Sequence, residues 1–281
     1  MSGTLYLVAT PIGNLADITY RAIDVLKNVD LIAAEDTRHS IKLLNHFEIK
    51  TPMTSYHEHN KIEKARVLVD KLLNGVNIAL VTDAGTPGIS DPGEELVKQA
   101  LDAGIAVSPI PGPAACICAL IMSGLPTRRF CFEAFLPADK KEQAEVMEEL
   151  SAETRTIVMH EAPHRLKKTL GLLAEYLGED RIISICKEIT KKHEKSIRLT
   201  IKEAIEYYEE NEAKGEYVLV IEGADKEVIR KEKEKEYDNM TILEHYQMYI
   251  NQGMSEKEAM KQVAKDRNIS KRDVYSEVKI Q

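Results

Sequence analysis

The chain has 281 residues, of which 43% are hydrophobic and 30% are charged, and its formal net charge at pH 7 is −8. This length exceeds what one ordinary core needs and fits two domains with an appendage. The acidic balance argues against a protein that coats nucleic acid non-specifically, although a local basic surface can still bind RNA.

The sequence gives no sign of a membrane segment. The longest apolar run, Ala114–Met122, is far shorter than the roughly 20 residues that span a bilayer. The stretch Met1–Thr10 lacks the basic start and apolar core of a secretory signal. We therefore expect a cytoplasmic protein with no membrane partner.

In the first part of the chain, short apolar runs alternate with helical patterns. These runs predict strands at residues 4–10, 30–34, 77–82 and 106–110. The helical patterns predict helices at residues 20–29, 37–47, 61–73, 94–103 and 114–122.

A second series of elements begins at Phe130. It predicts strands at residues 130–135, 156–160, 181–186, 196–200 and 217–221. It predicts helices at residues 140–150, 166–177 and 202–211. Strands that alternate with helices indicate an α/β fold whose sheets are at least partly parallel. We place the boundary near Gly124–Pro126, which gives one domain at 1–124 and a second at 125–225.

The remaining residues, 226–281, are predicted to form a charged linker and a small helical region. Lys226–Glu236 is a run of mixed charge, and helices are predicted at 241–251, 255–267 and 270–278. Ser255 with Glu258 has the spacing of a capping box, and Ser270 with Asp273 is a looser version. The last two helices resemble a helix-turn-helix, although a packing or dimerisation tail fits equally well.

Three loops rich in glycine and proline follow predicted strands of the first half, at residues 10–14, 82–93 and 109–115. Ligands of an open α/β sheet bind beyond the carboxyl ends of its strands. The dinucleotide fingerprint and the P-loop pattern are both absent from the sequence. We therefore expect a stiff, mostly uncharged pocket for an adenosine-like group, in which Asp83 accepts hydrogen bonds from a ligand.

Two charged motifs allow more than one interpretation. The cluster Glu35–His39 follows a buried strand, and either Asp36 or Thr37 caps a helix beside a solvated arginine. Alternatively, Arg38 holds a phosphate, and Glu35 orients that phosphate or a substrate hydroxyl. The stretch His160–His164 matches the zinc motif H-E-x-x-H, but Pro163 disfavours the helix that motif needs. We expect no metal.

Several segments resemble the ribosomal small-subunit RNA 2′-O-methyltransferase I family, which belongs to the tetrapyrrole methylase superfamily. They are LYLVATPIGNLADITYRAIDVLKNVDLIAAEDTRHS, LVTDAGTPGISDPG, PIPGPAA, GLPTRRFCFEAFLP, HEAPHRL, CKEIT and KGEYVLVIEG, and they occur in this order over residues 3–223. Departures are His160, where an aromatic residue is commoner, and the stretch after CKEIT, which lacks the family's usual glycine.

The resemblance implies a two-domain tetrapyrrole-methylase-like fold, in which each domain is a helix-flanked mixed sheet and a helical tail follows. It implies a homodimer with S-adenosylmethionine in the cleft between the domains. The positions that match the family's cofactor contacts are Ile12, Gly13, Asp83, Ala84, Gly85, Gly88, Pro113, Ala114, His160, Glu161 and Thr190.

The resemblance further implies methylation of the ribose 2′-hydroxyl of a cytidine in the decoding region of 16S ribosomal RNA, within the small ribosomal subunit. A ribose hydroxyl is a weak nucleophile, so a proton acceptor should assist. The candidate catalytic residues are Glu35, Arg38, Lys187 and Glu188, and His160 and Glu161 are further candidate proton acceptors. The candidate RNA-binding residues are Arg38, Arg128, Arg129, His164, Arg165, Lys271 and Arg272.

Two other functions stay open from the sequence. One is a methyltransferase of the same fold that acts on a tetrapyrrole or a protein. The A-E-D-T-R cluster and the basic tail favour RNA as the substrate instead. The other is a non-catalytic RNA-binding assembly factor that retains the pocket, against which the density of loop motifs argues.

Overall fold

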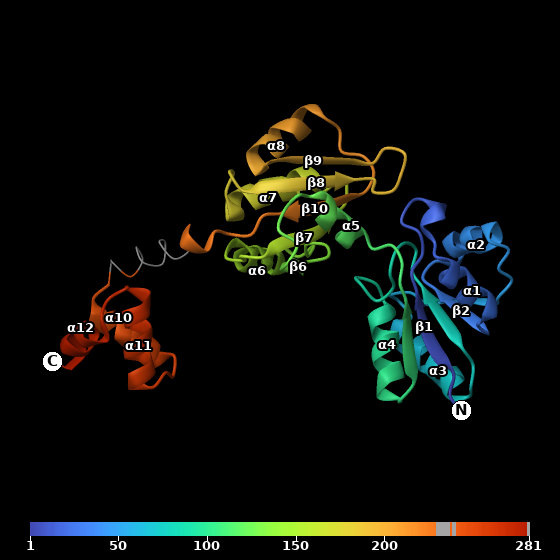
Figure 1. The fold of residues 1–281 in the computed structure, drawn as a ribbon, viewed down its shortest axis with the longest axis horizontal. Coiled ribbons are helices and arrows are strands. Elements are labelled where there is room, and N and C mark those ends of the chain that lie inside the picture. Colours follow the sequence, from blue (N-terminus) through green and yellow to red (C-terminus); the bar gives the residue numbers. More distant parts are fainter. Residues whose placement is uncertain (229–236, 238–239, 280–281) are drawn as a thin grey trace. The chain divides into compact units, whose positions relative to one another are not determined.

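The computed structural model describes residues 1–228, 237 and 240–279. The chain divides into two compact units, residues 1–148 with 155–222 and residues 149–154 with 223–281. The first unit holds two five-stranded sheets with their helices, and the helices of the tail lie in the second (Figure 1). Within the described residues, no helix has both the length and the apolar character that crossing a membrane requires. The predicted α/β class with a helical tail is confirmed.

The first sheet consists of β1 (Thr4–Val8), β2 (Leu31–Ala34), β3 (Met53–Ser55), β4 (Ile78–Val81) and β5 (Ala106–Ile110). Its order is β3-β2-β4-β1-β5, and all of its pairs are parallel. The expectation of a mixed sheet is therefore wrong for this half. Each helical crossover returns the chain to the sheet in its original direction, which makes the strands parallel.

Helices cover both faces of this sheet. They are α1 (Tyr20–Asn28), α2 (Thr37–His46), α3 (Lys61–Leu73) and α4 (Gly93–Asp102), and a short 3-10 turn, η1 (Leu15–Asp17), precedes α1. Buried residues of α1 and α2 share one cluster with Ala79 and Val81 of β4, whereas α3 and α4 share another with Ile78 and Leu80. Side chains of β4 alternate between the faces because successive residues of a strand point to opposite sides.

The connections of the sheet change direction between β1 and β4. The two strands are neighbours, but β1 leads to a helix on one face and β4 leads to a helix on the other. The chain segments that follow them therefore lead to helices on opposite faces, and the carboxyl ends of such a strand pair are where ligands of open α/β sheets bind. Two of the three glycine- and proline-rich loops begin there.

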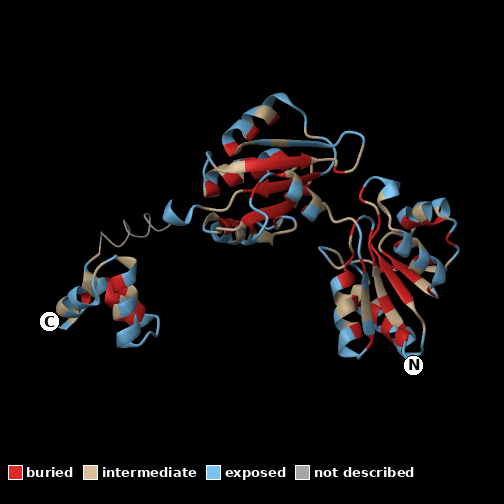
Figure 2. Cartoon of the chain, in the orientation of Figure 1, coloured by how far each residue is buried: buried red, intermediate tan, exposed pale blue. Residues whose placement is uncertain are grey.

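The second sheet consists of β6 (Phe130–Phe132), β7 (Thr156–Glu161), β8 (Ile182–Lys187), β9 (Lys195–Thr200) and β10 (Tyr217–Ile221). Its order is β6-β7-β10-β8-β9; β6 and β7 are parallel, and the other pairs are antiparallel. Three helices accompany it, α6 (Lys140–Ser151), α7 (Leu166–Leu177) and α8 (Ile201–Glu210). The central strands of both sheets are buried (Figure 2).

Helix α5 (Ala115–Met122) precedes the predicted domain boundary at 124 and packs against the second sheet. Its Ala119 and Leu120 lie in one buried cluster with Val158 of β7 and Val218 of β10. This helix is apolar around its whole circumference, and the side that does not face the sheet exposes Ile117 and Ile121. The division into domains at 124 and 225 stays a prediction.

The second unit folds around its own small core. Its helices are α10 (Ile242–Asn251), α11 (Glu256–Asp266) and α12 (Lys271–Lys279), and their core consists of Tyr246, Tyr249, Ala259, Val263, Ala264 and Val274. Both predicted N-terminal caps are present, because the carboxylates of Glu258 and Asp273 accept hydrogen bonds from the main-chain amides of Ser255 and Ser270. Of the predicted charged run 226–236, residues 229–236 lie outside the described residues.

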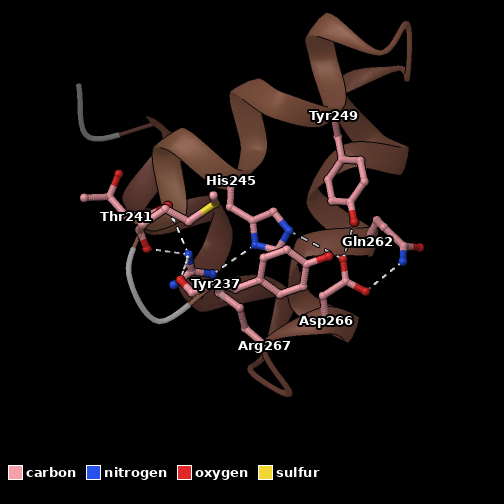
Figure 3. Close-up of polar contacts among 8 residues, drawn as sticks. Tyr237, Thr241, His245, Tyr249, Gln262, Asp266 and Arg267 are labelled. Atoms are coloured by element: carbon pink, nitrogen blue, oxygen red, sulfur yellow. Dashed lines mark hydrogen bonds and ion pairs between the residues drawn. The ribbon is translucent and has the colours of Figure 1, made fainter. Parts of the chain in front are cut away.

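A buried polar network holds the start of α10 to the end of α11 (Figure 3). The Arg267 guanidinium donates to the Nδ1 atom of His245 at 3.1 Å and to the Tyr237 carbonyl at 2.7 Å. The Tyr237 ring stacks on the imidazole of His245, which is fully buried. Burial lowers the pKa of His245, and the neighbouring Arg267 charge lowers it further. The imidazole is therefore held in its neutral form.

Candidate active site

The first and second loops are joined through their main chains. The Thr10 amide donates to the Gly85 carbonyl at 2.9 Å, and the Gly85 amide donates to the Thr10 carbonyl at 3.0 Å. Gly85 has a φ of +87°, a conformation that costs a residue without a side chain little. A Cβ atom at this position would lie 3.3 Å from Ile12 Cγ2. The loops after β1 and β4 therefore form one continuous surface.

The third loop closes on the other two. The Thr86 hydroxyl donates to the Pro113 carbonyl at 2.9 Å. A Cβ atom at Gly112 would lie only 2.7 Å from Ala9 Cβ, so the two backbones approach as closely as a glycine allows. The prediction that the three loops lie together at one edge of the sheet is confirmed.

A segment of the second half faces the first loop. Ile12 packs in one buried cluster with Ile189. A Cβ atom at Gly13 would lie 2.4 Å from Lys191 Cγ and 3.0 Å from Thr190 Oγ1. The Thr190 hydroxyl is buried and has no hydrogen-bond partner within the described structure. A buried hydroxyl without a partner costs free energy, so this atom beside Gly13 marks a place where a polar ligand group fits.

Carboxylates lie along the ends of β2 and β4. The Glu35 carboxylate accepts a hydrogen bond from the Thr82 hydroxyl at 2.5 Å. The Asp83 carboxylate accepts one from the Asp36 amide at 3.1 Å. Burial raises the pKa of Asp83, and the nearby Glu35 charge raises it further. This side of the site is therefore electronegative and attracts a cation.

Arg38 stands at the start of α2 beside its capping residue. Asp36 caps the helix, because its carboxylate accepts a hydrogen bond from the Arg38 amide at 2.8 Å. The Arg38 guanidinium contacts the same carboxylate at 2.8 Å, and this hydrogen bond lowers the pKa of Asp36 to about 2. The capping role of Asp36 is confirmed. The Arg38 side chain is 90% exposed, so a phosphate can reach it.

A cavity of about 350 Å³ lies beside the first loop. Its walls come from the loop after β1, from α2 and from the end of β4, and they consist of Thr10, Pro11, Gly13, Leu15, His39, Ser40, Lys42, Leu43, His46, Thr82 and Asp83. Gly13 and Asp83 are the predicted cofactor residues among them. His39 belongs to the cluster noted in the sequence, but Lys42 and His46 did not stand out, because isolated basic residues of a helix usually face solvent. Their spacing of three and four residues is the signal that places them on one helix face.

The predicted residues of β7 have partners of their own. The His160 ring lies 5.3 Å from the Phe132 ring and 5.5 Å from the Phe135 ring, and burial lowers its pKa. The Glu161 carboxylate is buried and accepts hydrogen bonds from the Ala162 amide and the Thr169 hydroxyl. His160 lies in β7, and His164 lies between β7 and α7. The expectation that no helix carries both histidines of the H-E-x-x-H match is therefore confirmed.

Lys187 ends β8 and Glu188 follows it, and each contacts the start of β10. The Lys187 ammonium lies 5.8 Å from the centre of the Tyr217 ring. The Glu188 carboxylate accepts hydrogen bonds from the Glu216 amide at 2.9 Å and from Lys191 at 3.1 Å. Burial raises the pKa of Glu188, but these two hydrogen bonds outweigh it, and the pKa is lowered overall. Glu188 is therefore a weak proton acceptor.

The other predicted residues are dispersed. The Gly88 amide donates to Asp91, and Ala114 precedes the first turn of α5. Ala84 is exposed beside Gly85. Among the predicted RNA contacts, Arg165 donates to the Leu136 carbonyl at 2.8 Å. Besides Arg38, the exposed ones are Arg128, Arg129 and His164 in the first unit, and Lys271 and Arg272 in the second.

Comparison with known proteins gives matches over most of the chain. Residues 4–205 match the family of Tetrapyrrole (Corrin/Porphyrin) Methylases. The protein named "Ribosomal RNA small subunit methyltransferase I" of Halalkalibacterium halodurans is 51% identical over 98% of this chain and 94% of its own length. The protein of the same name from Bacillus subtilis is 50% identical over 97% of this chain and 93% of its own length.

Solved structures show the same fold at low sequence identity. Diphthine synthase aligns with a TM-score of 0.63 and 13% identity over 79% of this chain and 90% of its own. Uroporphyrin-III-C-methyltransferase from Thermus thermophilus aligns with a TM-score of 0.56 and 18% identity over 78% of this chain and 94% of its own.

Proposed function

The chain belongs to the ribosomal RNA small subunit methyltransferase I family of tetrapyrrole-type methylases, and from this we propose that it methylates small-subunit ribosomal RNA with S-adenosylmethionine as the methyl donor. The proposed acceptor is the ribose 2′-hydroxyl of a cytidine in the decoding region of 16S ribosomal RNA. The single observation that supports an active pocket most is the joining of the three loops through Thr10, Gly85 and Pro113. Action in the cytoplasm and as a homodimer belongs to the same proposal.

The residues at this edge suit the cofactor. Gly13, Gly85 and Gly112 bring main-chain atoms to the surface where a side chain would collide with its neighbour. The unpartnered Thr190 hydroxyl offers a polar atom next to Gly13. When bound, S-adenosylmethionine supplies an activated methyl group on a positively charged sulfur. The carboxylates of Glu35 and Asp83 favour a positive charge nearby.

Proton acceptance falls to the residues of the first half. A weak hydroxyl nucleophile needs an acceptor within hydrogen-bond reach and with a pKa not far below the working pH. The Glu188 pKa is lowered, and the Glu161 carboxylate is buried among its own donors, so neither suits this task. We assign proton acceptance to the Glu35–Asp83 pair, in which the pKa of Asp83 is raised. Arg38 then holds an RNA phosphate, since its guanidinium is exposed.

A transfer assay tests the proposal. Purified protein is incubated with radiolabelled S-adenosylmethionine and with small ribosomal subunits from cells whose gene for this protein is deleted. We expect label in 16S ribosomal RNA, and nucleoside mass analysis should identify it as 2′-O-methylcytidine. Label in ribosomal proteins or in an added tetrapyrrole, with none in RNA, would contradict the proposal. An unchanged 2′-O-methylcytidine content in RNA from the deleted strain would contradict it as well.

A further inference from the structure

Helix α2 presents a basic face to the cavity beside the first loop. His39, Lys42 and His46 are exposed and stand three and four residues apart, so they lie on one side of the helix, and all three line the cavity. Within the described residues, the Lys42 ammonium has no ion-pair partner. The proposed function as derived above uses none of these three residues.

Another part of the cavity wall carries negative charge. Asp83 lines it from the end of β4, and Glu35 is held beside Asp83 through Thr82. Like charges repel, so a sulfonium group is favoured at the carboxylate side and disfavoured beside Lys42. A phosphate has the reverse preference. The cavity wall therefore carries both charges, with His39 beside Asp83, and the wall around Lys42 suits an anionic group that is not the methyl donor.

The volume of the cavity and its other lining residues indicate which kind of anionic ligand fits it. Pockets for small ligands enclose roughly 300–1,000 Å³, so about 350 Å³ suits a single small group and not a helix of RNA. Leu15 is 44% exposed in the loop and lies with Leu43 and the two imidazoles around the cavity. Proteins that read RNA commonly take one unstacked base onto aromatic or imidazole planes while cations hold its phosphates.

We infer that the α2-lined cavity receives the acceptor nucleotide, unstacked from the RNA, with Lys42 on its phosphate and His39 and His46 beside its base. This inference rests on the proposed function, because it assigns the RNA of that reaction to one wall of the cavity. It separates the roles of the two sides: carboxylates attract the methyl donor, and α2 holds the acceptor.

The test compares three variants of α2 with a control. Lys42→Gln removes the charge, Lys42→Arg keeps it, and a double variant, His39→Ala with His46→Ala, removes both imidazoles. Lys50→Gln is the control, because Lys50 is exposed, precedes β3 at the other edge of the sheet and does not line the cavity. All proteins are assayed with small subunits that lack the methyl group, at saturating cofactor and at several salt concentrations. Anisotropy of a fluorescent single-stranded oligoribonucleotide measures RNA binding without methyl transfer.

We expect Lys42→Gln to raise the KM for subunits by about three- to tenfold and to reduce the slope of log affinity against log salt by about one. Lys42→Arg should restore most of both, and the double histidine variant should raise the KM by about fivefold. Cofactor affinity, measured by calorimetry, should be unchanged in all of them. Lys50→Gln should match the wild type.

The two readouts separate this inference from the proposed function. If the wild type transfers no methyl group but binds the oligoribonucleotide through Lys42, the proposed function fails and the basic wall stands. If methyl transfer proceeds and Lys42→Gln leaves both the KM and the salt slope unchanged, the basic wall is wrong. An equal effect of Lys50→Gln overturns it too, because it would reflect overall charge. A wild type that neither binds nor methylates RNA overturns both.

Discussion

In the first sheet every strand runs in the same direction, whereas in the second β6, β7 and β8 run one way and β9 and β10 run the other. Parallel strands all end at one edge, so three separate loops of the first half meet there and contact one another. Antiparallel strands end alternately at opposite edges. The second half therefore contributes a shorter stretch, in which Glu188 after β8 contacts Glu216 before β10.

This difference suggests unequal duties. The first sheet supplies the loop surface, the carboxylates and the basic wall, and the second supplies a facing segment that includes the unpartnered Thr190 hydroxyl. Substitutions in the loops of the first sheet should therefore affect ligand binding, and those in the second, Thr190 apart, should affect mainly stability. Four substitutions test this contrast.

The largest effect is expected from Asp83→Ala. The change removes the carboxylate that faces the cavity and leaves the Asp36 amide without its acceptor. We expect no measurable binding of S-adenosylmethionine by calorimetry. Asp102→Ala is the control, because Asp102 is exposed at the far end of α4. Wild-type affinity in Asp83→Ala would remove this carboxylate from the cofactor site.

Gly13→Ala comes next and probes the junction of the two halves. The new methyl group would lie 2.4 Å from Lys191 Cγ, so either the loop or the facing segment must move. We expect cofactor affinity to fall by about ten- to a hundredfold, which is the range that overpacking of a close contact produces. Calorimetry with the folded variant measures this fall. Unchanged affinity would show that the approach of Gly13 to Thr190 is not needed for binding.

Glu188→Gln probes the second sheet. The variant loses the charge that Lys191 and the Glu216 amide stabilise, so we expect a loss of about 1 kcal/mol in the free energy of unfolding at pH 7 and little change in cofactor affinity. Because folding lowers the Glu188 pKa, its stabilisation is fully present above the ordinary value of 4.5 and is lost as the pH falls through the folded value. Denaturant titrations between pH 7 and pH 3 should show the difference from wild type shrinking.

A control for this prediction is Glu209→Gln, since Glu209 is exposed on α8 and should give a small difference that varies little with pH. A large drop in cofactor affinity with unchanged stability in Glu188→Gln would contradict the division of duties, because it would place a ligand contact in the second sheet.

The smallest effect, of opposite sign, is expected from Gly171→Ala. Gly171 lies in α7, and a Cβ atom there has open space around it. Alanine favours a helix over glycine, so stability should rise by about 0.5–1 kcal/mol. The two glycine-to-alanine substitutions can be compared directly. Gly13→Ala should weaken cofactor binding, whereas Gly171→Ala should only raise the free energy of unfolding. A loss of stability in Gly171→Ala, measured by thermal unfolding, would count against the packing of α7.

The elements with a strong apolar pattern could be predicted from the sequence. The helix at 61–73 and the strand at 217–221 match α3 and β10 at both ends. The pattern did not predict β3, because Met53–Ser55 is three residues long and has no apolar alternation. It also extended β6 to Phe135, whereas Ala134 takes a φ of +49° and turns the chain out of the strand.

The loops of the site could be predicted from the sequence, but the hydrogen-bond partners of its side chains could not. Glycine and proline around residues 11–14, 83–88 and 111–114 predict special backbone positions, and the structure has positive φ at Gly85 and Gly88 and close approaches at Gly13 and Gly112. Which carboxylates already accept hydrogen bonds within the protein depends on tertiary contacts, as the bonds to Glu161 from Thr169 and to Glu188 from Glu216 show. The basic face of α2 was missed because a helical pattern alone does not show what the exposed side of a helix adjoins.

The bridge between Thr10 and Gly85 has a consequence for how this pocket tolerates change. Both of its hydrogen bonds use main-chain atoms, so any side chain that fits the buried position of Thr10 can keep them. At Gly85 the requirement is a backbone angle and not a functional group. The contact between the two loops thus depends on backbone geometry. Side chains elsewhere in these loops can therefore vary, and substrate preference with them, while the contact stays the same.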